Sequence, residues 1–367
     1  MQNDITISEF SSITQIEESI WNELVDQFSI STFHKYEWMR AYEKSYPHQA
    51  LKSVHHLVGR NSFGELIALL PLFHTQGCPY WLSMAAEIKH STDIFSKPYL
   101  ASHSWYAFYS DVIGDRDSDE YETFIKQAVR RIDVICAQLE IPYSCFTAIK
   151  PTDPLSQLLQ NEGYRPFNIM DNNALNLQTD NFEEYVKNLR SYKMRRNIKA
   201  YSKRLENSGI KKGWLVKPTT GEIEKFHDLL FETYTRHAAA HLTDPLETLS
   251  SIFTEMPENA GLFVLHNDKD WIAAANCFVN KDVFTACYAG MIMSDPLKRL
   301  NLRLNLYCAI IEQAMKLNCI RVEFGRTGYE FKAKMGIARE PTRTLIKAYG
   351  DNAGEVYNSF HELEGSY

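Results

Sequence analysis

The 367-residue sequence lacks the patterns that define several large protein classes. No run of about 18 apolar residues occurs, so we expect no transmembrane helix. The first residues have neither the basic start nor the apolar core of a signal peptide. A Walker loop, a dinucleotide fingerprint, a His-Glu-x-x-His motif and a Gly-x-Ser-x-Gly elbow are also absent. The sequence therefore predicts a cytoplasmic protein with no metal site and no covalent nucleophile.

The cysteines do not form a framework. There are seven, an odd number, and no two of them form a Cys-x-x-Cys pair. Most lie inside apolar segments, which is typical of reduced, packed thiols in a cytoplasmic protein rather than of disulfides or metal ligands.

The net charge of −7 argues against a protein that coats nucleic acid. Residues 181–207 are the local exception, because they hold eight basic and only three acidic residues. The basic residues are Lys187, Arg190, Lys193, Arg195, Arg196, Lys199, Lys203 and Arg204. An apolar stripe from Phe182 to Leu205, which includes Tyr192, predicts that one face of this helix, or pair of helices, is buried. The basic faces are then either a solvated flank or an anion site for a phosphate-rich substrate. Arg190, Arg195 and Arg196 are the candidate substrate-binding residues, together with Lys334.

The stretch from Val283 to Gly336 predicts a strand, a basic loop, a long helix and a second strand. The helix, residues 301–317, repeats apolar residues at spacings of three and four. Lys298, Arg299 and Arg303 fall in the loop and the first helical turn. A helix N-terminus exposes unpaired N–H groups and carries partial positive charge, so these three cations predict a site for a phosphate-bearing cofactor or donor.

This unit resembles the acyl-donor-binding core of the GNAT acyltransferases. Residues 323–336, Glu-Phe-Gly-Arg-Thr-Gly-Tyr-Glu-Phe-Lys-Ala-Lys-Met-Gly, resemble the closing motif of the double-domain branch. That branch contains the Fem-type aminoacyl transferases of peptidoglycan synthesis and acetyltransferases grouped with cellulose biosynthesis. Ordinary GNAT enzymes carry a Gly-rich pyrophosphate loop before the helix. Residues 294–300 contain no glycine, and Fem-type members also tend to lose it, so the donor stays open.

The resemblance implies an α/β fold of two tandem GNAT-like domains, with mixed sheets flanked by helices. We expect residues 1–170 to form a degenerate domain on the acceptor side, and residues 171–367 to form the donor-binding, catalytic domain. Residues 77–117 are either a cleft-lining insertion or a packed loop. Residues 356–364 read as a weak tail.

The resemblance also implies site residues. A Phe-Lys pair in the Fem-type closing motif places a lysine beside the reacting carbonyl, and Phe331 and Lys332 match that pair. The alternative is that Lys332 and Lys334 are surface lysines on a strand edge. Arg326, just past a strand end, is a further catalytic candidate, or a structural partner of a nearby glutamate. Tyr288 is a candidate general acid.

Four residues near position 240 are weaker candidates. His237 and His241 have the i, i+4 spacing that suits a metal or a proton relay, but no third ligand is evident. Asp244 and Glu247 could accept the proton of an amine.

We therefore expect an N-acyltransferase that moves an acyl group from an acyl-CoA-type thioester to an amine by direct attack. Acyl-CoA is then a co-substrate rather than a bound cofactor, and the acceptor is a small or sugar-linked amine. The alternatives are a Fem-type transferase that uses aminoacyl-tRNA and a cell-wall precursor, or a non-catalytic module that binds an anionic sugar.

Overall fold

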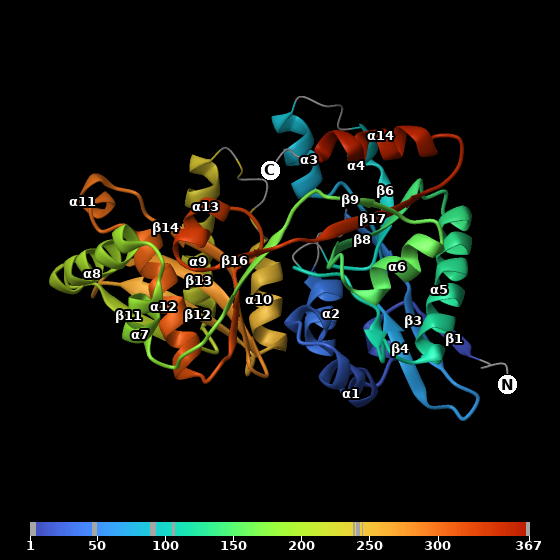
Figure 1. Ribbon diagram of the computed structural model, residues 1–367, viewed down its shortest axis with the longest axis horizontal. Coiled ribbons are helices and arrows are strands. Elements are labelled where there is room, and N and C mark those ends of the chain that lie inside the picture. Colours follow the sequence, from blue (N-terminus) through green and yellow to red (C-terminus); the bar gives the residue numbers. More distant parts are fainter. Residues whose placement is uncertain are drawn as a thin grey trace. The chain divides into compact units, whose positions relative to one another are not determined.

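The computed structural model describes residues 5–45, 50–88, 93–104, 107–237, 239, 243 and 245–364 (Figure 1). The chain divides into two compact units: residues 1–171 with 341–367, and residues 172–340. The division differs from the expected one at its end, because residues 341–367 return to the first unit. Strand β17 (Arg343–Ala348) causes this return, since it pairs with β8 and β9 of the first unit.

The first unit contains two sheets, with strand orders β1-β3-β4-β7 and β2-β5-β6-β8-β17-β9. All their pairs are antiparallel except β6 with β8. The strands other than β17 are β1 (Thr6–Phe10), β2 (Leu51–Val54), β3 (His56–Arg60), β4 (Leu66–Leu70), β5 (Phe73–Gln76), β6 (Pro98–Ala101), β7 (Ile113–Gly114), β8 (Tyr143–Ile149) and β9 (Arg165–Phe167). The helices are α1 (Glu18–Phe28), α2 (Tyr36–Ser45), α3 (Pro79–Glu87), α4 (Asp93–Ser96), α5 (Asp119–Gln138), α6 (Pro154–Asn161) and α14 (Ala353–Leu363), with short 3-10 turns at Ile13–Gln15 and Thr32–His34.

Aromatic side chains fill one core of this unit. Trp81 of α3, Tyr99 of β6, Tyr143 of β8 and Phe360 of α14 lie with ring centres 5.0 to 6.2 Å apart in the pairs that touch. The described part of residues 77–117 is therefore packed rather than cleft-lining. The expectation of a weak C-terminal tail is wrong, because α14 buries Phe360 completely.

The second unit contains one seven-stranded sheet, ordered β11-β12-β13-β14-β15-β10-β16. Every pair is antiparallel except β14 with β15. The strands are β10 (Asn172–Asn176), β11 (Lys211–Val216), β12 (Ala260–His266), β13 (Trp271–Asn280), β14 (Val283–Met291), β15 (Arg321–Glu323) and β16 (Ala338–Glu340). The helices are α7 (Phe182–Asn188), α8 (Tyr192–Asn207), α9 (Thr220–Arg236), α10 (Leu246–Glu255), α11 (Asp295–Lys298), α12 (Leu302–Lys316) and α13 (Tyr329–Lys334).

Helices cover both faces of this sheet. One apolar core joins α7, α8 and α12 to strand residues such as Phe263 and Phe284. Figure 1 shows α7 and α8 beside α12, with which both make contact. Helix α9 packs on β14 so closely that a Cβ on Gly290 would lie 2.4 Å from the carbonyl carbon of Leu229, so only glycine fits there. None of the described helices is long and apolar enough to cross a membrane.

The strand–helix–strand unit expected from the sequence is present as β14, α12 and β15. The two strands are parallel and joined through α11 and α12, as a βαβ crossover requires. They pair only where Val283–Thr285 meets Arg321–Glu323. β15 ends at Glu323, so β14 continues from Thr285 to Met291 without pairing with it.

Candidate active site

A β-bulge lies in the part of β14 beyond its pairing with β15. The register between β13 and β14 shifts between Ala275 and Cys277. The side chain of Asn276, which is buried, accepts a hydrogen bond of 2.7 Å from the backbone N–H of Tyr288. Asn276 therefore fixes the bulge, and Tyr288 lies half-buried within it.

Two asparagine side chains bind backbone groups at the N-terminus of α12. Asn301 adopts a left-handed conformation, with φ of 48°, and its side chain accepts from the backbone N–H of Leu304 at 3.4 Å. The side chain of Asn305 donates to the carbonyl of Leu300 at 2.7 Å and to that of Tyr201 at 3.3 Å. These bonds attach the loop before α12 to α8.

The three cations expected at this helix start are exposed, but they are not equivalent. Lys298 lies 2.7 Å from Asp295, so its charge is already balanced. The carbonyl of Arg299 accepts a long bond from Arg204 of α8. Lys298 therefore has a carboxylate beside it, and the start of α12 has a side-chain cap.

Arg303 and Phe331 lie together. The guanidinium carbon of Arg303 is 4.3 Å from the centre of the Phe331 ring, within the range of a cation–π interaction. Tyr307 meets Phe331 edge to face at 5.1 Å. Gly328 has φ of 65°, and a Cβ there would come within 2.7 Å of the Arg303 guanidinium. The closing motif thus folds directly over the first turn of α12.

Lys332 is 2% exposed, although the sequence alternatives were a surface lysine or one facing a donor. It lies on the short helix α13, not on a strand edge. Its ammonium donates to the carbonyl oxygens of Phe324 (2.8 Å), Gly325 (3.2 Å) and Arg326 (2.9 Å). All three protons of the ammonium group therefore bind the backbone that directly follows β15. Burial lowers the pKa of Lys332 to about 7, and the charge of Arg303 acts in the same direction, whereas the three carbonyls favour the ammonium.

Other charged residues of the closing motif lie next to Lys332 in the sequence. The carbonyl of Arg326 accepts from Lys332, and its side chain is half-buried. Of the two glutamates near Arg326, Glu323 pairs with Arg321 at 3.2 Å, and Glu330 lies 3.8 Å from the exposed Lys334.

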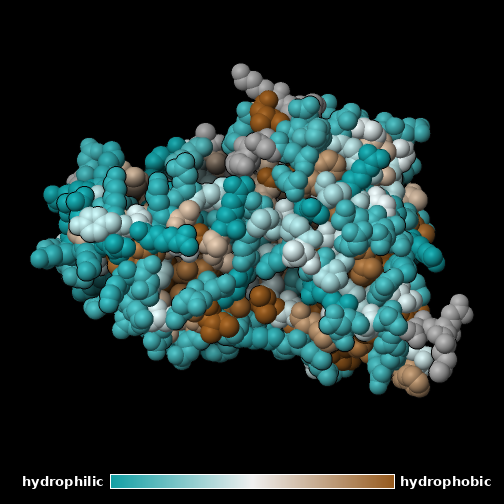
Figure 2. All heavy atoms as spheres, in the orientation of Figure 1, coloured by the Kyte–Doolittle hydropathy of each residue, from teal (hydrophilic) through white to brown (hydrophobic). Residues whose placement is uncertain are grey.

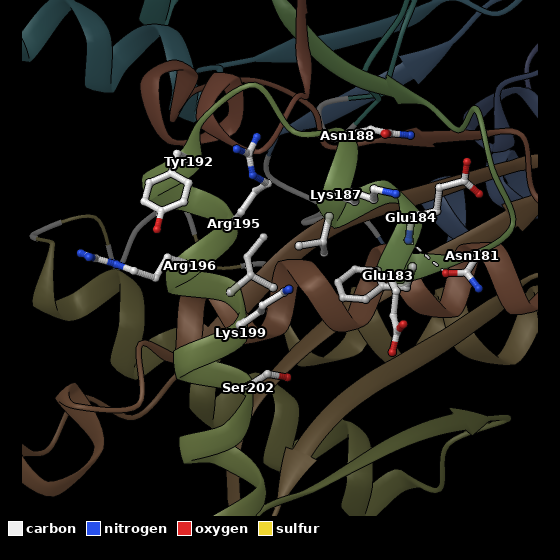
Figure 3. Close-up of a pocket in the computed structure, with 13 residues that line it drawn as sticks. Asn181, Glu183, Glu184, Lys187, Asn188, Tyr192, Arg195, Arg196, Lys199 and Ser202 are labelled. Atoms are coloured by element: carbon white, nitrogen blue, oxygen red, sulfur yellow. Dashed lines mark hydrogen bonds between the residues drawn. The ribbon is translucent and has the colours of Figure 1, made fainter.

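A groove of about 960 Å³ lies between α7 and α8 (Figure 3). The chain breaks into these two helices at Leu189–Ser191, and the break turns Tyr192 outward, where it is 69% exposed. Tyr192 is therefore not part of the buried stripe that the sequence predicts. The side chains that line the groove on these helices include Lys187, Asn188, Arg195, Arg196, Lys199 and Ser202.

The candidate arginines of this region have different roles. Arg195 is half-buried and donates to the carbonyl of Leu189 at the end of α7, so it holds the two helices together. Arg196 and Lys199 are exposed in the groove. In Figure 3, Lys199 extends toward α7 and Arg196 away from it. Arg190 is exposed and is not among the lining residues.

Helix α7 also connects the groove to the closing motif. The hydroxyl of Tyr185 donates to the carbonyl of Met335, and burial raises the pKa of Tyr185. Leu189 packs against Gly336, where an added Cβ would lie 3.2 Å from its methyl group. The groove and the Lys332 helix therefore belong to one packed assembly. The composition of residues 181–207 indicated a basic surface, but the hollow depends on a helix break that composition does not reveal.

The weaker candidates receive no support. His237 lies exposed after the end of α9, and Glu247 is exposed in the first turn of α10. His241 and Asp244 lie outside the described residues.

Comparison with known proteins gives both a family and a fold. Residues 12–364 match the model of the FemAB-like family, described as peptidoglycan biosynthesis/recognition. The solved structure of FemX is similar, with a TM-score of 0.65 and 9% identity over 96% of this chain and 99% of that one. The L-PGS of Bacillus licheniformis follows at 0.56, with 10% identity over 95% and 98% of the two chains. No curated protein matches the chain.

A third similar structure is described as a tandem GNAT protein from the clavulanic acid biosynthesis pathway. Its TM-score is 0.55, with 11% identity over 95% of this chain and 99% of that one. At such low identity these likenesses show the fold alone. They confirm the expected α/β architecture of two tandem GNAT-like halves with mixed sheets.

Proposed function

This chain belongs to the FemAB-like family, and from that premise we propose that it transfers an aminoacyl group from aminoacyl-tRNA to an amine of a cell-wall precursor. Family membership supports acyl or aminoacyl transfer in general. The finer assignment rests on the basic groove between α7 and α8 and on its connection, through α7, to the Lys332 helix.

The groove suits a polyanionic donor. Lys187, Arg196 and Lys199 are exposed there, and Tyr192 offers an exposed ring on which a base can stack. Phe182, Val186 and Ile198 also line the groove, so its lining is part basic and part apolar, while the surrounding surface is mostly hydrophilic (Figure 2). Backbone phosphates neutralised by such cations release counterions, which gives affinity without sequence readout.

Transfer then needs proximity and a group that stabilises the oxyanion. In direct attack the amine nitrogen bonds to the ester carbonyl carbon, the bond from that carbon to the ribose oxygen of the tRNA breaks, and the proton lost by the amine ends on that oxygen. Binding both partners in one complex supplies much of the rate. We assign the oxyanion contact to Lys332. One of its N–H groups exchanges a backbone carbonyl of residues 324–326 for the oxyanion, while the other two keep the lysine in place. Losing a single oxyanion donor typically lowers kcat by about 100- to 1,000-fold.

An acyl-CoA donor is the second candidate. Arg299 and Arg303 remain exposed at the start of α12, where a pyrophosphate would meet them. The Lys298–Asp295 pair, the cap by Asn301 and the absence of glycine in residues 294–300 all weigh against it.

Binding measurements separate the two donors. We expect tRNA to bind with an affinity that falls steeply with salt, and Arg196→Glu or Lys199→Glu to reduce the slope of log K against log salt by about one each. Lys126→Glu, on an exposed part of α5 in the other unit, is the matched control and leaves the slope unchanged. Calorimetric binding of CoA thioesters without any tRNA binding would replace this proposal with the second candidate.

A further inference from the structure

Four polar side chains of the first unit form an unbroken hydrogen-bonded chain. The carboxylate of Glu9 on β1 lies 2.7 Å from Nδ1 of His55. Nε2 of His55 lies 2.8 Å from the hydroxyl of Ser53 on β2. The same hydroxyl lies 3.1 Å from Nδ1 of His74 on β5. Arg131 of α5 donates to the other oxygen of Glu9.

The strand arrangement explains why these residues meet. Ser53 and His55 are two residues apart at the end of β2, so their side chains share one face of the chain. His55 lies between β2 and β3, where the chain passes from the six-stranded to the four-stranded sheet, and its N–H is held by the carbonyl of Leu72 at 2.9 Å. β1 contributes Glu9 through its pairing with β3, in which Glu9 lies opposite Leu57.

The ionisation of Glu9 decides which atom donates in each of these hydrogen bonds. Burial alone would raise the pKa of Glu9, but hydrogen bonds from His55 and Arg131 outweigh burial and lower it. An ionised carboxylate only accepts, so His55 donates to Glu9 from Nδ1, and in the neutral ring with this tautomer Nε2 is the acceptor that faces Ser53. The Ser53 hydroxyl can then donate to His55.

The far end of the chain agrees with this direction. Burial is the main cause that lowers the pKa of His74 to about 4, and the charge of Lys52 acts in the same direction, so the ring is neutral near neutral pH. Since the only proton of Ser53 goes to His55, Nδ1 of His74 must donate to Ser53. The hydroxyl oxygen therefore faces a base on one side and an N–H donor on the other.

We propose that Ser53 is an activated nucleophile that accepts an acyl group from small activated esters or thioesters. A serine, a histidine and a carboxylate, bonded in this order, are the arrangement that activates a serine hydroxyl. In the step, the bond between Ser53 Oγ and the acyl carbon forms. The bond from that carbon to the leaving oxygen or sulfur breaks. The hydroxyl proton passes to Nε2 of His55 and then to the leaving group. Glu9 and Arg131 act as positioning residues, and the N–H of His74 stabilises the serine oxygen as its proton leaves.

The site is reachable by a small molecule. Ser53 is half-buried, and the side chains of His55 and Glu9 are 16% and 24% exposed. The proposal does not depend on the transferase function, because all five residues belong to the first unit and none of them lies in the α7–α8 groove or the closing motif.

The test uses the full-length protein with p-nitrophenyl acetate and, separately, a fluorophosphonate probe, followed by peptide mass spectrometry. We expect one acetyl or phosphonyl group on Ser53 in the native protein and none after unfolding in urea. His55→Gln should slow labelling by at least about 100-fold, which is the usual contribution of a general base. Glu9→Gln should slow it too.

Ser19 is the internal control, because its hydroxyl is exposed and bonded to a carboxylate, Glu17 at 2.6 Å, without a histidine. Native labelling of Ser53 at the rate of Ser19, or equal labelling in native and urea-unfolded protein, would overturn the proposal. So would an unchanged rate in a folded His55→Gln variant. If that variant does not fold, the comparison of native with unfolded wild type decides alone.

Discussion

At the scale of single residues, Lys332 is buried although its sequence surroundings predict an exposed lysine. A lysine in a charged stretch of Lys, Arg and Glu reads as solvated, yet this one is inside and bonded to three carbonyls. Leaving three such acceptors without a donor costs more than losing one surface charge. Lys332 therefore supports the end of β15 whatever its part in chemistry is.

The burial of Lys332 gives a prediction about pH. Its pKa is lowered to about 7 in the folded protein from an ordinary value of 10.5, so above pH 7 the unfolded chain binds more protons than the folded one. Stability from this group therefore rises with pH through that window, by at most about 1.4 kcal/mol per pH unit. We expect the free energy of unfolding of wild type, relative to Lys332→Met, to increase between pH 7 and pH 9 in urea titrations. A difference that stays constant over this range would contradict the lowered pKa.

The Ser53 cluster marks the limit of sequence reasoning at this scale. Ser53 and His55 are close in sequence, but Glu9, His74 and Arg131 are supplied by other strands and by α5. No spacing rule connects these segments, because only strand pairing brings them together. The absence of a Gly-x-Ser-x-Gly motif excludes a nucleophile elbow. It does not exclude a serine such as Ser53, whose partners come from separate strands.

At the scale of elements, periodicity predicted α12 well. For residues 181–207 it left one helix or two open, and the structure has two, α7 and α8. The apolar stripe of α12 is uninterrupted, and the helix runs from Leu302 to Lys316, close to the expected range. A single apolar stripe from Phe182 to Leu205 would run through the break at Leu189–Ser191, and this break resets the helical phase. Within α8 the buried positions are Met194, Ile198 and Leu205, so Tyr192 falls on the outside.

The break between α7 and α8 also gives adjacent arginines opposite roles. The guanidinium of Arg195 satisfies the carbonyl of Leu189, whereas Arg196 is exposed in the groove. We expect Arg195→Met to lower the free energy of unfolding by about 1.5–3 kcal/mol, as for a hydrogen bond to a charged group. Arg196→Met, the matched control, should leave stability within about 0.5 kcal/mol. Urea denaturation of both variants tests this, and equal losses would show that Arg195 does not hold the helix junction.

At the scale of the whole molecule, residues 341–367 return to the first unit, which the order of the chain does not predict. Residues 341–367 follow the closing motif directly, so proximity along the chain assigned them to the second domain. Their apolar residues pack elsewhere: Leu345 in the core beneath α5, and Val356, Phe360 and Leu363 among the aromatic rings of α3, β6 and β8. Nothing in the sequence of β17 shows which sheet this strand joins.

The cores of the two units share no residue, which makes the division testable. Phe360 is fully buried in the first unit and Ile311 in the second. Phe360→Ala should cost about 3–5 kcal/mol and Ile311→Ala about 2–5 kcal/mol. In hydrogen exchange followed by mass spectrometry, we expect Phe360→Ala to lower amide protection in α5 and β8 while α12 and β13 keep theirs.

Ile311→Ala should show the reverse pattern, because local opening follows the packed unit rather than the order of the chain. Its volume change is smaller than that of Phe360→Ala, so the comparison depends on where protection is lost and not on how much. If Phe360→Ala released the amides of α12 and left α5 protected, residues 341–367 would have to be assigned to the second unit after all.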